Sequence, residues 1–306
     1  MKKVLIAPSV FATPDSTPLE KLIRNGFELI KNPYGRKLTR EELVHLLPGV
    51  QGLIAGLETL NRDILKSSNL RVISRCGSGI SNIDLDAARE LRINVFSTPE
   101  APTNAVAELT IGAMISLIRY IPQMNSDLHN AKWTKKIGSQ LEGRAVIIIG
   151  FGRIGRKIAE LLMPFRVNII AVDPDCNLTS KGVRFLSLEE ALPQADIITI
   201  HAAGDRIILG RKEFAAMKNG VFLLNCARGN IIDEAELVRS LENGLVSGAW
   251  LDCFSEEPYV GPLTKYPQVI LTPHVGSYTA ECRKRMEMEA VDNLITGFQE
   301  LEDEGI

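Results

Sequence analysis

Three residues suited to proton and anion chemistry follow three apolar runs in the second half of the sequence. Arg228 comes after GVFLLNCA, Glu257 follows SGAWLDCF, and His274 closes VILTPH. Each run is typical of a buried parallel strand, and ligands gather where the carboxyl ends of such strands meet. Any one of these residues could simply close a strand or cap a turn. Their occurrence at three strand ends of one predicted sheet indicates a shared site.

The three residue types together suit hydride transfer at a 2-oxo or 2-hydroxy acid. Reduction of a ketone needs a proton donor with a pKa near neutrality, which histidine supplies. A carboxylate beside the histidine raises its pKa and fixes its tautomer. Arginine binds a substrate carboxylate through its planar fork.

A glycine-rich turn could hold the cofactor for such a reaction. The segment VIIIGFGRIG, residues 146–155, is an apolar strand followed by the Gly-x-Gly-x-x-Gly spacing of a dinucleotide-binding turn. Gly150 permits the turn, Gly152 lets the backbone approach a pyrophosphate, and Gly155 lets the next helix pack on the strand. The N-terminus of that helix offers free N–H groups and a positive dipole end.

An acid at the end of the following strand favours NAD over NADP. Asp173 closes VNIIAVD and lies 18 residues beyond Gly155, close to the ~20-residue spacing of the acid that binds the ribose hydroxyls. Its charge would repel a 2′-phosphate. Arg153, inside the turn, either contacts a phosphate or extends into solvent.

Two α/β regions must position these residues. In the first hundred residues, the runs VLIAP, FELIKNP, GLIAGLE, LRVISRCGSG and INVFSTP alternate with helical segments, which predicts a mostly parallel sheet. Apolar residues at three- and four-residue steps predict one long helix from Thr103 to Leu128, within which Gly112 suggests close packing. Six later apolar runs, from VIIIG to VILTPH, predict a doubly wound dinucleotide fold. The stretch from Tyr278 to Leu301 is helical again.

The composition excludes several classes of function. The chain has 306 residues, 45% of them hydrophobic and 24% charged, with a net charge of −2, which fits about two globular domains. Without blocks of like charge, we expect no nucleic-acid or membrane partner. No run approaches the ~18–20 apolar residues that cross a bilayer. The N-terminus lacks a secretory h-region, so we expect a cytoplasmic protein.

The cysteines and histidines provide no recognisable metal-ligand spacing, so no metal site is expected. The cysteines have no CxxC pair and are interpreted as reduced, mostly buried thiols. They are Cys76, Cys176, Cys226, Cys253 and Cys282.

Several segments resemble the D-isomer-specific 2-hydroxyacid dehydrogenases, over almost the whole chain. Within that family the sequence most resembles the phosphoglycerate dehydrogenase branch, through NCARG and the IPQ…KW stretch from Ile121 to Trp133. The segments similar to the family signatures, substrate loop and interdomain helix are NCARGNIID (225–233), LDCFSEEP (251–258), TPHVG (272–276), RCGSGISNID (75–84) and AELT (107–110).

The resemblance implies roles for individual residues. Arg228 would bind substrate, His274 would be the acid/base, and Glu257 would pair with His274. The substrate carboxylate would be held in a glycine-rich anion nest formed by Gly77, Ser78 and Gly79, with Arg75. His201 is expected to be structural or close to the cofactor rather than catalytic. The implied cofactor-binding set is Gly150, Gly152, Arg153, Ile154, Gly155, Asp173, His201, Ala202, Cys226, Ala227, Asp252 and Gly276.

The resemblance also implies an α/β architecture of two Rossmann-like doubly wound domains, with the nucleotide-binding domain inserted into a flavodoxin-like substrate domain. Residues 1–99 and 277–306 would form the substrate domain, and residues 100–276 the NAD-binding domain. The cleft between them would close on substrate. A homodimer through the nucleotide domain is expected. The loop around Trp133 is its candidate contact, unless that side chain is simply exposed or packed internally.

Three positions depart from the family pattern. Ser81 stands where the substrate loop usually has aspartate. The segment LIAGLE, residues 53–58, has Gly56 and Glu58 and lacks the arginine that helps the phosphoglycerate branch hold its phosphate. The loop after His201 is shorter than in the family. The candidate substrates are therefore 3-phosphoglycerate, hydroxypyruvate, glyoxylate or another small 2-oxo acid.

Two other functions stay open at this point. The first is an NAD(H)-binding regulatory protein, like the transcriptional corepressors that share this fold. The second is a dehydrogenase that oxidises phosphite. A formate dehydrogenase is disfavoured, because that branch has glutamine where this sequence has Glu257.

Overall fold

The computed structural model of the protein describes residues 1–13, 15–175, 178–204 and 206–305. Two residues considered in the sequence analysis lie outside the described residues. They are Cys176, one of the predicted thiols, and Asp205, in the loop after His201. The chain divides into two compact units. Unit 1 comprises Met1–Pro102 and Ser277–Ile306, and unit 2 comprises Thr103–Gly276. Unit 2 is therefore inserted between two segments that fold together.

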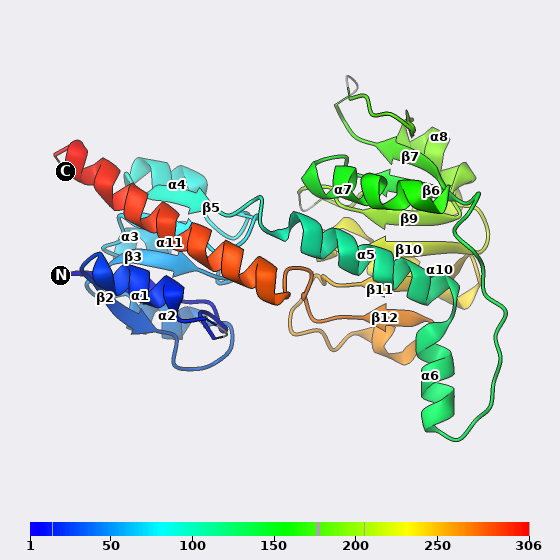
Figure 1. Ribbon diagram of the computed structural model, residues 1–306, viewed down its shortest axis with the longest axis horizontal. Helices are drawn as coiled ribbons and strands as arrows, with labels where there is room; N and C mark the ends of the chain where they lie inside the picture. Colours follow the sequence, from blue (N-terminus) through cyan, green and yellow to red (C-terminus); the bar gives the residue numbers. More distant parts are fainter. Residues whose placement is uncertain (14, 176–177, 205, 306) are drawn as a thin grey trace. The chain divides into compact units, whose positions relative to one another are not determined.

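Unit 1 is a five-stranded parallel sheet with helices on both faces (Figure 1). Its strand order, β2-β1-β3-β4-β5, is that of a flavodoxin-like fold, as predicted. The strands are β1 Lys2–Ile6, β2 Phe27–Lys31, β3 Val50–Ala55, β4 Val72–Arg75 and β5 Asn94–Ser97. The helices are α1 Thr17–Arg24, α2 Arg40–Leu46, α3 Arg62–Ser67, α4 Leu85–Glu90 and α11 Ala280–Asp303.

Each face of this sheet has its own apolar core. On one face, side chains of α2, α3 and α4 such as Leu43, Ile64 and Ala87 pack on the strands. On the other face, α1 and α11 pack, and α11 contributes Leu294 and Phe298 among others. The last helix of the chain thus completes a sheet formed by the first hundred residues.

Unit 2 is a seven-stranded parallel sheet in the order β12-β11-β10-β9-β6-β7-β8. The order reverses between β6 and β9, which is the switch point where a doubly wound fold binds its ligand. The strands are β6 Ala145–Ile149, β7 Asn168–Val172, β8 Val183–Phe185, β9 Ile197–Ile200, β10 Val221–Asn225, β11 Val246–Leu251 and β12 Val269–Leu271. The six predicted strands are confirmed. The seventh, β8, was missed because it is a three-residue edge strand in which Arg184 is exposed.

Helices cover both faces of this sheet. Side chains of α5 Pro102–Ile118 and α7 Arg153–Leu162 pack on one face. The other face is covered by α8 Leu188–Ala191, α9 Arg211–Ala215 and α10 Glu234–Glu242. Strands buried on both faces need apolar residues at nearly every position, which explains their continuous apolar runs.

The prediction of one long helix from Thr103 to Leu128 is wrong. The helix ends at Ile118 and restarts as α6 Ile121–His129, bent by 66°. Tyr120 at the break has a left-handed backbone with φ 53°, and Pro122 lies in the first turn of α6. Gly112 is also not closely packed, because a Cβ there would meet no described heavy atom within 4 Å. In the described residues, no single helix is long and apolar enough to cross a bilayer, although α5 and α6 together reach that length and composition.

Candidate active site

Arg228, Glu257 and His274 follow three adjacent strands of unit 2. The last residues of these strands, Asn225 of β10, Leu251 of β11 and Leu271 of β12, are paired in register in the parallel sheet. The segments that follow therefore start side by side at one edge. The fold places the three predicted residues at the carboxyl edge of the sheet.

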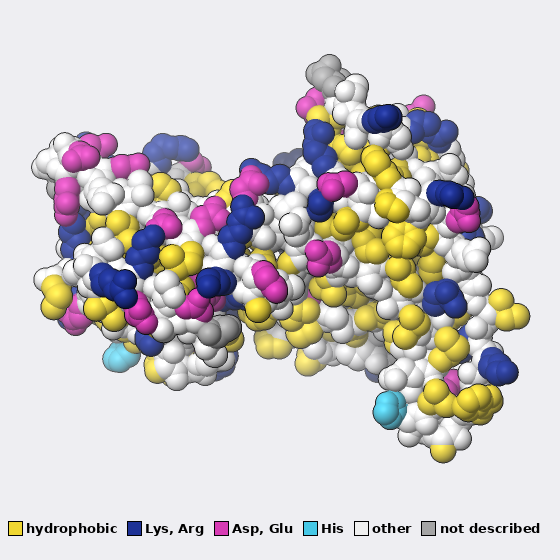
Figure 2. Space-filling view, viewed as in Figure 1, with side chains coloured by type: hydrophobic (Ala, Val, Ile, Leu, Met, Phe, Trp, Pro, Cys, Tyr) yellow, Lys and Arg dark blue, Asp and Glu magenta, His cyan; other side chains and the backbone are white. Residues whose placement is uncertain are grey.

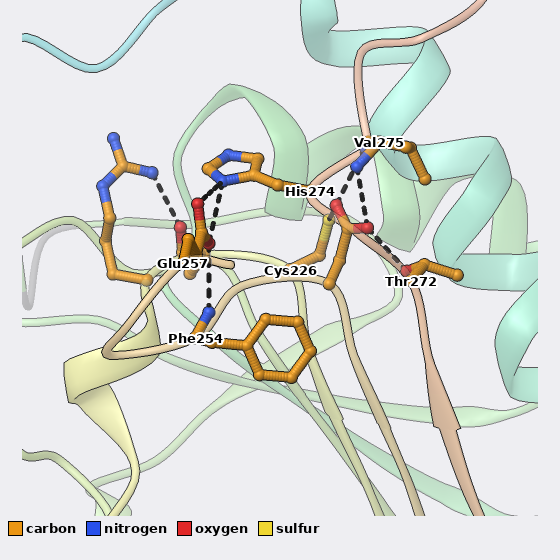
Figure 3. A network of polar contacts seen from close by, with 10 residues as sticks. Cys226, Phe254, Glu257, Thr272, His274 and Val275 are labelled. Atoms are coloured by element: carbon orange, nitrogen blue, oxygen red, sulfur yellow. Dashed lines mark hydrogen bonds and ion pairs between the residues drawn. The ribbon is translucent and has the colours of Figure 1, made fainter. Parts of the chain in front are cut away.

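His274 and Glu257 form a direct pair (Figure 3). Nδ1 of His274 lies 3.1 Å from each carboxylate oxygen of Glu257, and the other ring nitrogen points away from Glu257. The amide of Phe254 donates a hydrogen bond of 3.2 Å to Glu257 Oε1, which fixes the carboxylate. The His274 side chain is 33% exposed and that of Glu257 is 30% exposed, so both are reachable from solvent.

The surroundings of His274 favour its protonated form. Hydrogen bonds with Cys253 and then with Glu257 raise the pKa of His274 to about 10, and partial burial opposes them. The imidazole therefore carries a proton throughout the neutral range. A protonated histidine with one nitrogen held by a carboxylate can donate its other proton to a developing alkoxide.

A buried carboxylate holds the loop that carries His274. Asp252 is fully buried, and its Oδ1 accepts hydrogen bonds from the Thr272 hydroxyl at 2.6 Å and the Val275 amide at 2.9 Å. Its Oδ2 accepts from the Gly276 amide at 2.8 Å and from Cys226 Sγ at 3.4 Å. The sequence placed Asp252 among the cofactor-binding residues. Both oxygens are occupied by hydrogen bonds within unit 2, and the place of Asp252 in the cofactor-binding set stays a prediction.

The backbone of His274 needs this support. Its φ of 55° lies in the left-handed region, and its amide bonds back to the Thr272 carbonyl at 3.0 Å. Such a conformation costs on the order of 1–3 kcal/mol for a residue with a Cβ and persists only where its surroundings impose it. Asp252 supplies that constraint on both sides of His274.

The turn that carries Arg228 is held by a second buried polar side chain. Asn225 is fully buried, its Nδ2 donates to the Arg228 carbonyl at 2.9 Å, and its Oδ1 accepts from the Ala227 amide at 3.1 Å. Arg228 Nη1 donates to the Ala227 carbonyl at 2.7 Å. Gly229 then packs against the backbone of the loop that carries Glu257, because a Cβ on Gly229 would lie 1.8 Å from the Phe254 carbonyl carbon.

The glycine-rich turn fits a dinucleotide. Gly150 has φ 92°, and a Cβ there would lie 2.5 Å from the Ala202 amide nitrogen. A Cβ on Gly155 would lie 2.2 Å from the Gly150 carbonyl oxygen, so no larger residue fits at either position. Gly152 is the N-cap of α7 and has no side chain to occupy the amides of the first helical turn, where Arg153 and Ile154 lie. These amides can bind a pyrophosphate.

Asp173 lies beside this turn at the end of β7. Its Oδ2 accepts a hydrogen bond of 2.7 Å from the Phe151 amide, and its Oδ1 accepts from the Asp175 amide at 3.0 Å. In a dinucleotide-binding fold, a carboxylate at this position accepts hydrogen bonds from the ribose hydroxyls of the bound dinucleotide. This geometry fits NAD.

His201 is unsuited to proton transfer. It is largely buried after β9, and its Nε2 lies 2.7 Å from the Thr199 hydroxyl. Desolvation lowers the pKa of His201 to about 3, which keeps the ring neutral. Its backbone lies against Gly150, since a Cβ on that glycine would be 2.7 Å from the His201 carbonyl carbon. These contacts favour the structural, cofactor-adjacent role expected from the sequence.

The predicted anion nest in unit 1 is only partly available. The Gly77 amide donates to the Thr98 hydroxyl at 2.7 Å, and the Gly77 carbonyl accepts from the Thr98 amide at 3.0 Å. Gly77, at φ 145°, packs against the Arg75 guanidinium, which would lie 2.3 Å from a Cβ there. The Gly77 amide is thus used inside unit 1. The amides of Ser78 and Gly79 remain as the proposed anion donors.

The segment that lacks the family's arginine, around Gly56, is fixed by contacts within unit 1. The carboxylate of Glu58 is almost completely buried and accepts a hydrogen bond of 2.6 Å from the Gly56 amide. Desolvation raises the pKa of Glu58. A Cβ on Gly56 would lie 2.9 Å from Glu58 Oε2 and 3.3 Å from the Pro8 Cα, so an arginine does not fit there without displacing Glu58.

Three residues of the site went unrecognised in the sequence. Asn225 and Thr272 act only by holding the loops at the ends of β10 and β12. Cys253 was interpreted as a small core residue, yet its Sγ lies within 4.8 Å of ligand atoms of Glu257 and His274. Both loop-holding residues lie inside the family-like segments 225–233 and 272–276. Asn225 bonds within its own turn, to Ala227 and Arg228, whereas Thr272 bonds to Asp252, which follows a neighbouring strand.

Known proteins show clear similarity to this chain. A family model described as D-isomer specific 2-hydroxyacid dehydrogenase, NAD binding domain, matches residues 111–276. The chain is 36% identical over 299 residues to a hydroxypyruvate reductase of Thermotoga maritima, covering 93% of this chain and 96% of that protein. It is 36% identical over 296 residues to a D-3-phosphoglycerate dehydrogenase of Sus scrofa, covering 93% of this chain and 54% of that protein. The chain therefore spans about half the length of such phosphoglycerate dehydrogenases.

Solved structures share the fold over nearly the full chain. A glyoxylate reductase from Paecilomyes thermophila superposes with a TM-score of 0.85 at 31% identity, covering 96% of this chain and 94% of that one. The two-domain parallel α/β architecture is thus shared with an enzyme of this type.

Proposed function

Because the chain belongs to the D-isomer specific 2-hydroxyacid dehydrogenase family, we propose that it interconverts a small D-2-hydroxy acid and the corresponding 2-oxo acid with NAD. The observation that carries this proposal is the His274–Glu257 pair, with Nδ1 3.1 Å from both carboxylate oxygens. The pair lies at the same sheet edge as Arg228. Acid, carboxylate and arginine are the groups that ketone reduction requires.

Residues 111–276 match the family's NAD-binding domain. We assign the pyrophosphate to the Gly150–Gly155 turn and the start of α7, and the ribose hydroxyls to Asp173, whose carboxylate disfavours NADP. A nicotinamide cofactor held by these residues would supply the hydride-transfer chemistry. Ala202, Ala227 and the other family-implied contacts line the strand ends around this turn in the proposed complex.

In the reducing direction, His274 donates its Nε2 proton to the oxygen of the reacting carbonyl. Glu257 stabilises the imidazolium before transfer and holds the ring in place through Nδ1. Arg228 binds the substrate carboxylate and polarises the carbonyl. In unit 1, we assign the amides of Ser78 and Gly79, with Arg75, to binding an anion.

We propose an unphosphorylated substrate such as glyoxylate or hydroxypyruvate. The segment of residues 53–58 has Gly56 and the buried Glu58, and it lacks the arginine with which the phosphoglycerate branch helps hold its phosphate. The missing arginine disfavours 3-phosphoglycerate.

A substrate panel tests this proposal. We expect NADH oxidation with glyoxylate or hydroxypyruvate to exceed that with pyruvate or 2-oxoglutarate, and NADPH to be a poor substitute. NAD reduction by 3-phosphoglycerate or by phosphite should be weak or absent. If no compound is turned over but NADH still quenches protein fluorescence on binding, the NAD(H)-binding regulatory alternative replaces the enzyme.

The raised pKa of His274, about 10, predicts the pH dependence. Reduction needs the protonated imidazole, so its kcat/KM should stay level through neutral pH and fall as the pH rises through about 10. Oxidation needs the neutral ring and should rise with pH over the same range. Cys253→Ala removes one of the contacts that raise the pKa of His274, so the fall in kcat/KM for reduction should move to lower pH. The pH dependence of kcat/KM, recorded with chelator present, checks this. A fall centred near the ordinary histidine pKa in the native protein would contradict it.

We propose a cytoplasmic homodimer in which the segment around α6 forms the contact. Hydrophobic side chains gather over α6 in Figure 2, and Trp133 and Ile137 are 81% and 97% exposed. Large exposed apolar side chains mark association surfaces. The four described cysteines are free, in keeping with a reducing compartment. Sedimentation of the native protein and of Trp133→Ala tests the contact, and cell fractionation tests the location.

A further inference from the structure

Three potential metal ligands converge at the active site. One ligand atom each from Cys253, Glu257 and His274 lies within 4.8 Å of the other two. A thiolate, a carboxylate and an imidazole are donors that Zn²⁺ and related thiophilic cations prefer. We propose that these three residues form an inhibitory site for such a divalent cation, which immobilises His274 when it binds.

The geometry is close to that of a zinc site. Tetrahedral coordination with Zn–S of about 2.3 Å and Zn–N of about 2.0 Å places ligand atoms roughly 3.3–3.8 Å apart. Nδ1 of His274 is already 3.1 Å from both Glu257 oxygens. The remaining separations are at most 4.8 Å, so they must shorten by up to about 1 Å to reach coordination distances. Three protein ligands leave a fourth position for water.

The ligands are held by the two strand ends described above. Cys253 and Glu257 follow β11 and His274 follows β12, which are adjacent in the sheet. Cys253 directly follows the buried Asp252, and the Phe254 amide holds Glu257. Cys253 itself is buried, whereas about a third of the His274 and Glu257 side chains is exposed. An ion can therefore enter from the histidine side and meet the thiol beneath.

Binding exchanges protons for the ion. The Cys253 thiol loses its proton and binds through Sγ, and the Nδ1 proton of His274 is released so that Nδ1 binds. Nε2 then keeps the only ring proton. It cannot accept a second proton, and donating the one it has would leave an imidazolate. The bound ion therefore blocks proton transfer in both directions. This inhibitory effect rests on the proposed function, but the binding of the ion does not.

Cadmium is the probe for binding, because its thiolate complexes absorb in the ultraviolet. We expect Cd²⁺ titrated into chelator-treated, full-length protein to produce a thiolate charge-transfer band that saturates at one ion per chain and that Zn²⁺ removes by competition. The band should be lost in Cys253→Ser and in Cys253→Ala, and kept in Cys282→Ser, a control thiol in unit 1. His274→Gln should weaken Cd²⁺ binding by about 10-fold or more. No band in the native protein, or an undiminished band in both folded Cys253 variants, overturns the site.

Inhibition is the second measurement. Zn²⁺ should inhibit turnover of the best panel substrate, chelator should restore it, and Cys253→Ser should need at least about 10-fold more Zn²⁺ for half-inhibition of its own activity. Equal sensitivity of the two proteins overturns the inhibitory role. If no substrate is turned over, the proposed function fails while the cadmium titration still decides the site.

Discussion

His274→Gln is expected to lower kcat by about 10²- to 10⁴-fold, the usual contribution of a general acid–base group. Glutamine has a similar length and its amide N–H can still donate a hydrogen bond to the Glu257 carboxylate, but it has no proton to transfer in the accessible pH range. Because His274 follows β12 and lies outside the glycine turn, NADH binding should survive. Steady-state kinetics together with a fluorescence titration of NADH separate the two effects.

The same substitution at a histidine outside the candidate site is the control for this prediction. His45→Gln replaces an exposed histidine of unit 1 and should leave kcat within a factor of about two, as surface substitutions usually do. A near-normal rate for His274→Gln would remove His274 from the acid/base role and would direct attention to a water or to the substrate itself as proton source.

Gly229→Ala is expected to be the most disruptive small substitution in unit 2. Its Cβ would lie 1.8 Å from the Phe254 carbonyl carbon and 2.2 Å from both the Phe254 oxygen and the Ser255 nitrogen. These are backbone atoms, so the loops bearing Arg228 and Glu257 must separate. Overpacking of this kind costs about 1–3 kcal/mol or more, and we expect kcat/KM to fall as well, since two site residues move.

Thermal unfolding and kcat/KM, measured in parallel, check this second prediction. A destabilisation of 1 kcal/mol lowers the Tm by about 2–4 °C in a domain of this size. Gly112→Ala is the control, because a Cβ there meets no described atom within 4 Å in a helix with ordinary φ. It should raise stability by up to about 1 kcal/mol. An unchanged Tm and unchanged kcat/KM for Gly229→Ala would show that the two loops are looser than their contacts imply.

The sheets were predictable because doubly covered parallel strands must be apolar along their whole length. This requirement identifies β6, β9 and β10 from their apolar sequences. It does not identify β8, which lies at an edge of the sheet. The break at Tyr120 was not predictable from periodicity, since the apolar repeat continues on either side of it. Pro122, in the first turn of α6, is the sequence signal that the periodicity overrode, and the left-handed backbone of Tyr120 forms the bend.

The candidate site was predictable where a residue acts by its own chemistry at a strand end. His274, Glu257 and Arg228 met that condition. Residues that act through a partner from another segment did not. The Gly77 amide is taken by Thr98, which follows a different strand, and Cys253 becomes a partner of His274 only when β11 and β12 lie side by side.

The position of α11 has a consequence for synthesis on the ribosome. All strands of unit 1 leave the ribosome early, but one face of their sheet is covered largely by Leu294, Phe298 and their neighbours from the last helix. Unit 2 is contiguous from Thr103 to Gly276 and has its whole core before that helix is made. The inserted unit can therefore fold first during translation, while the older N-terminal sheet keeps an apolar face uncovered until the end of the chain is released.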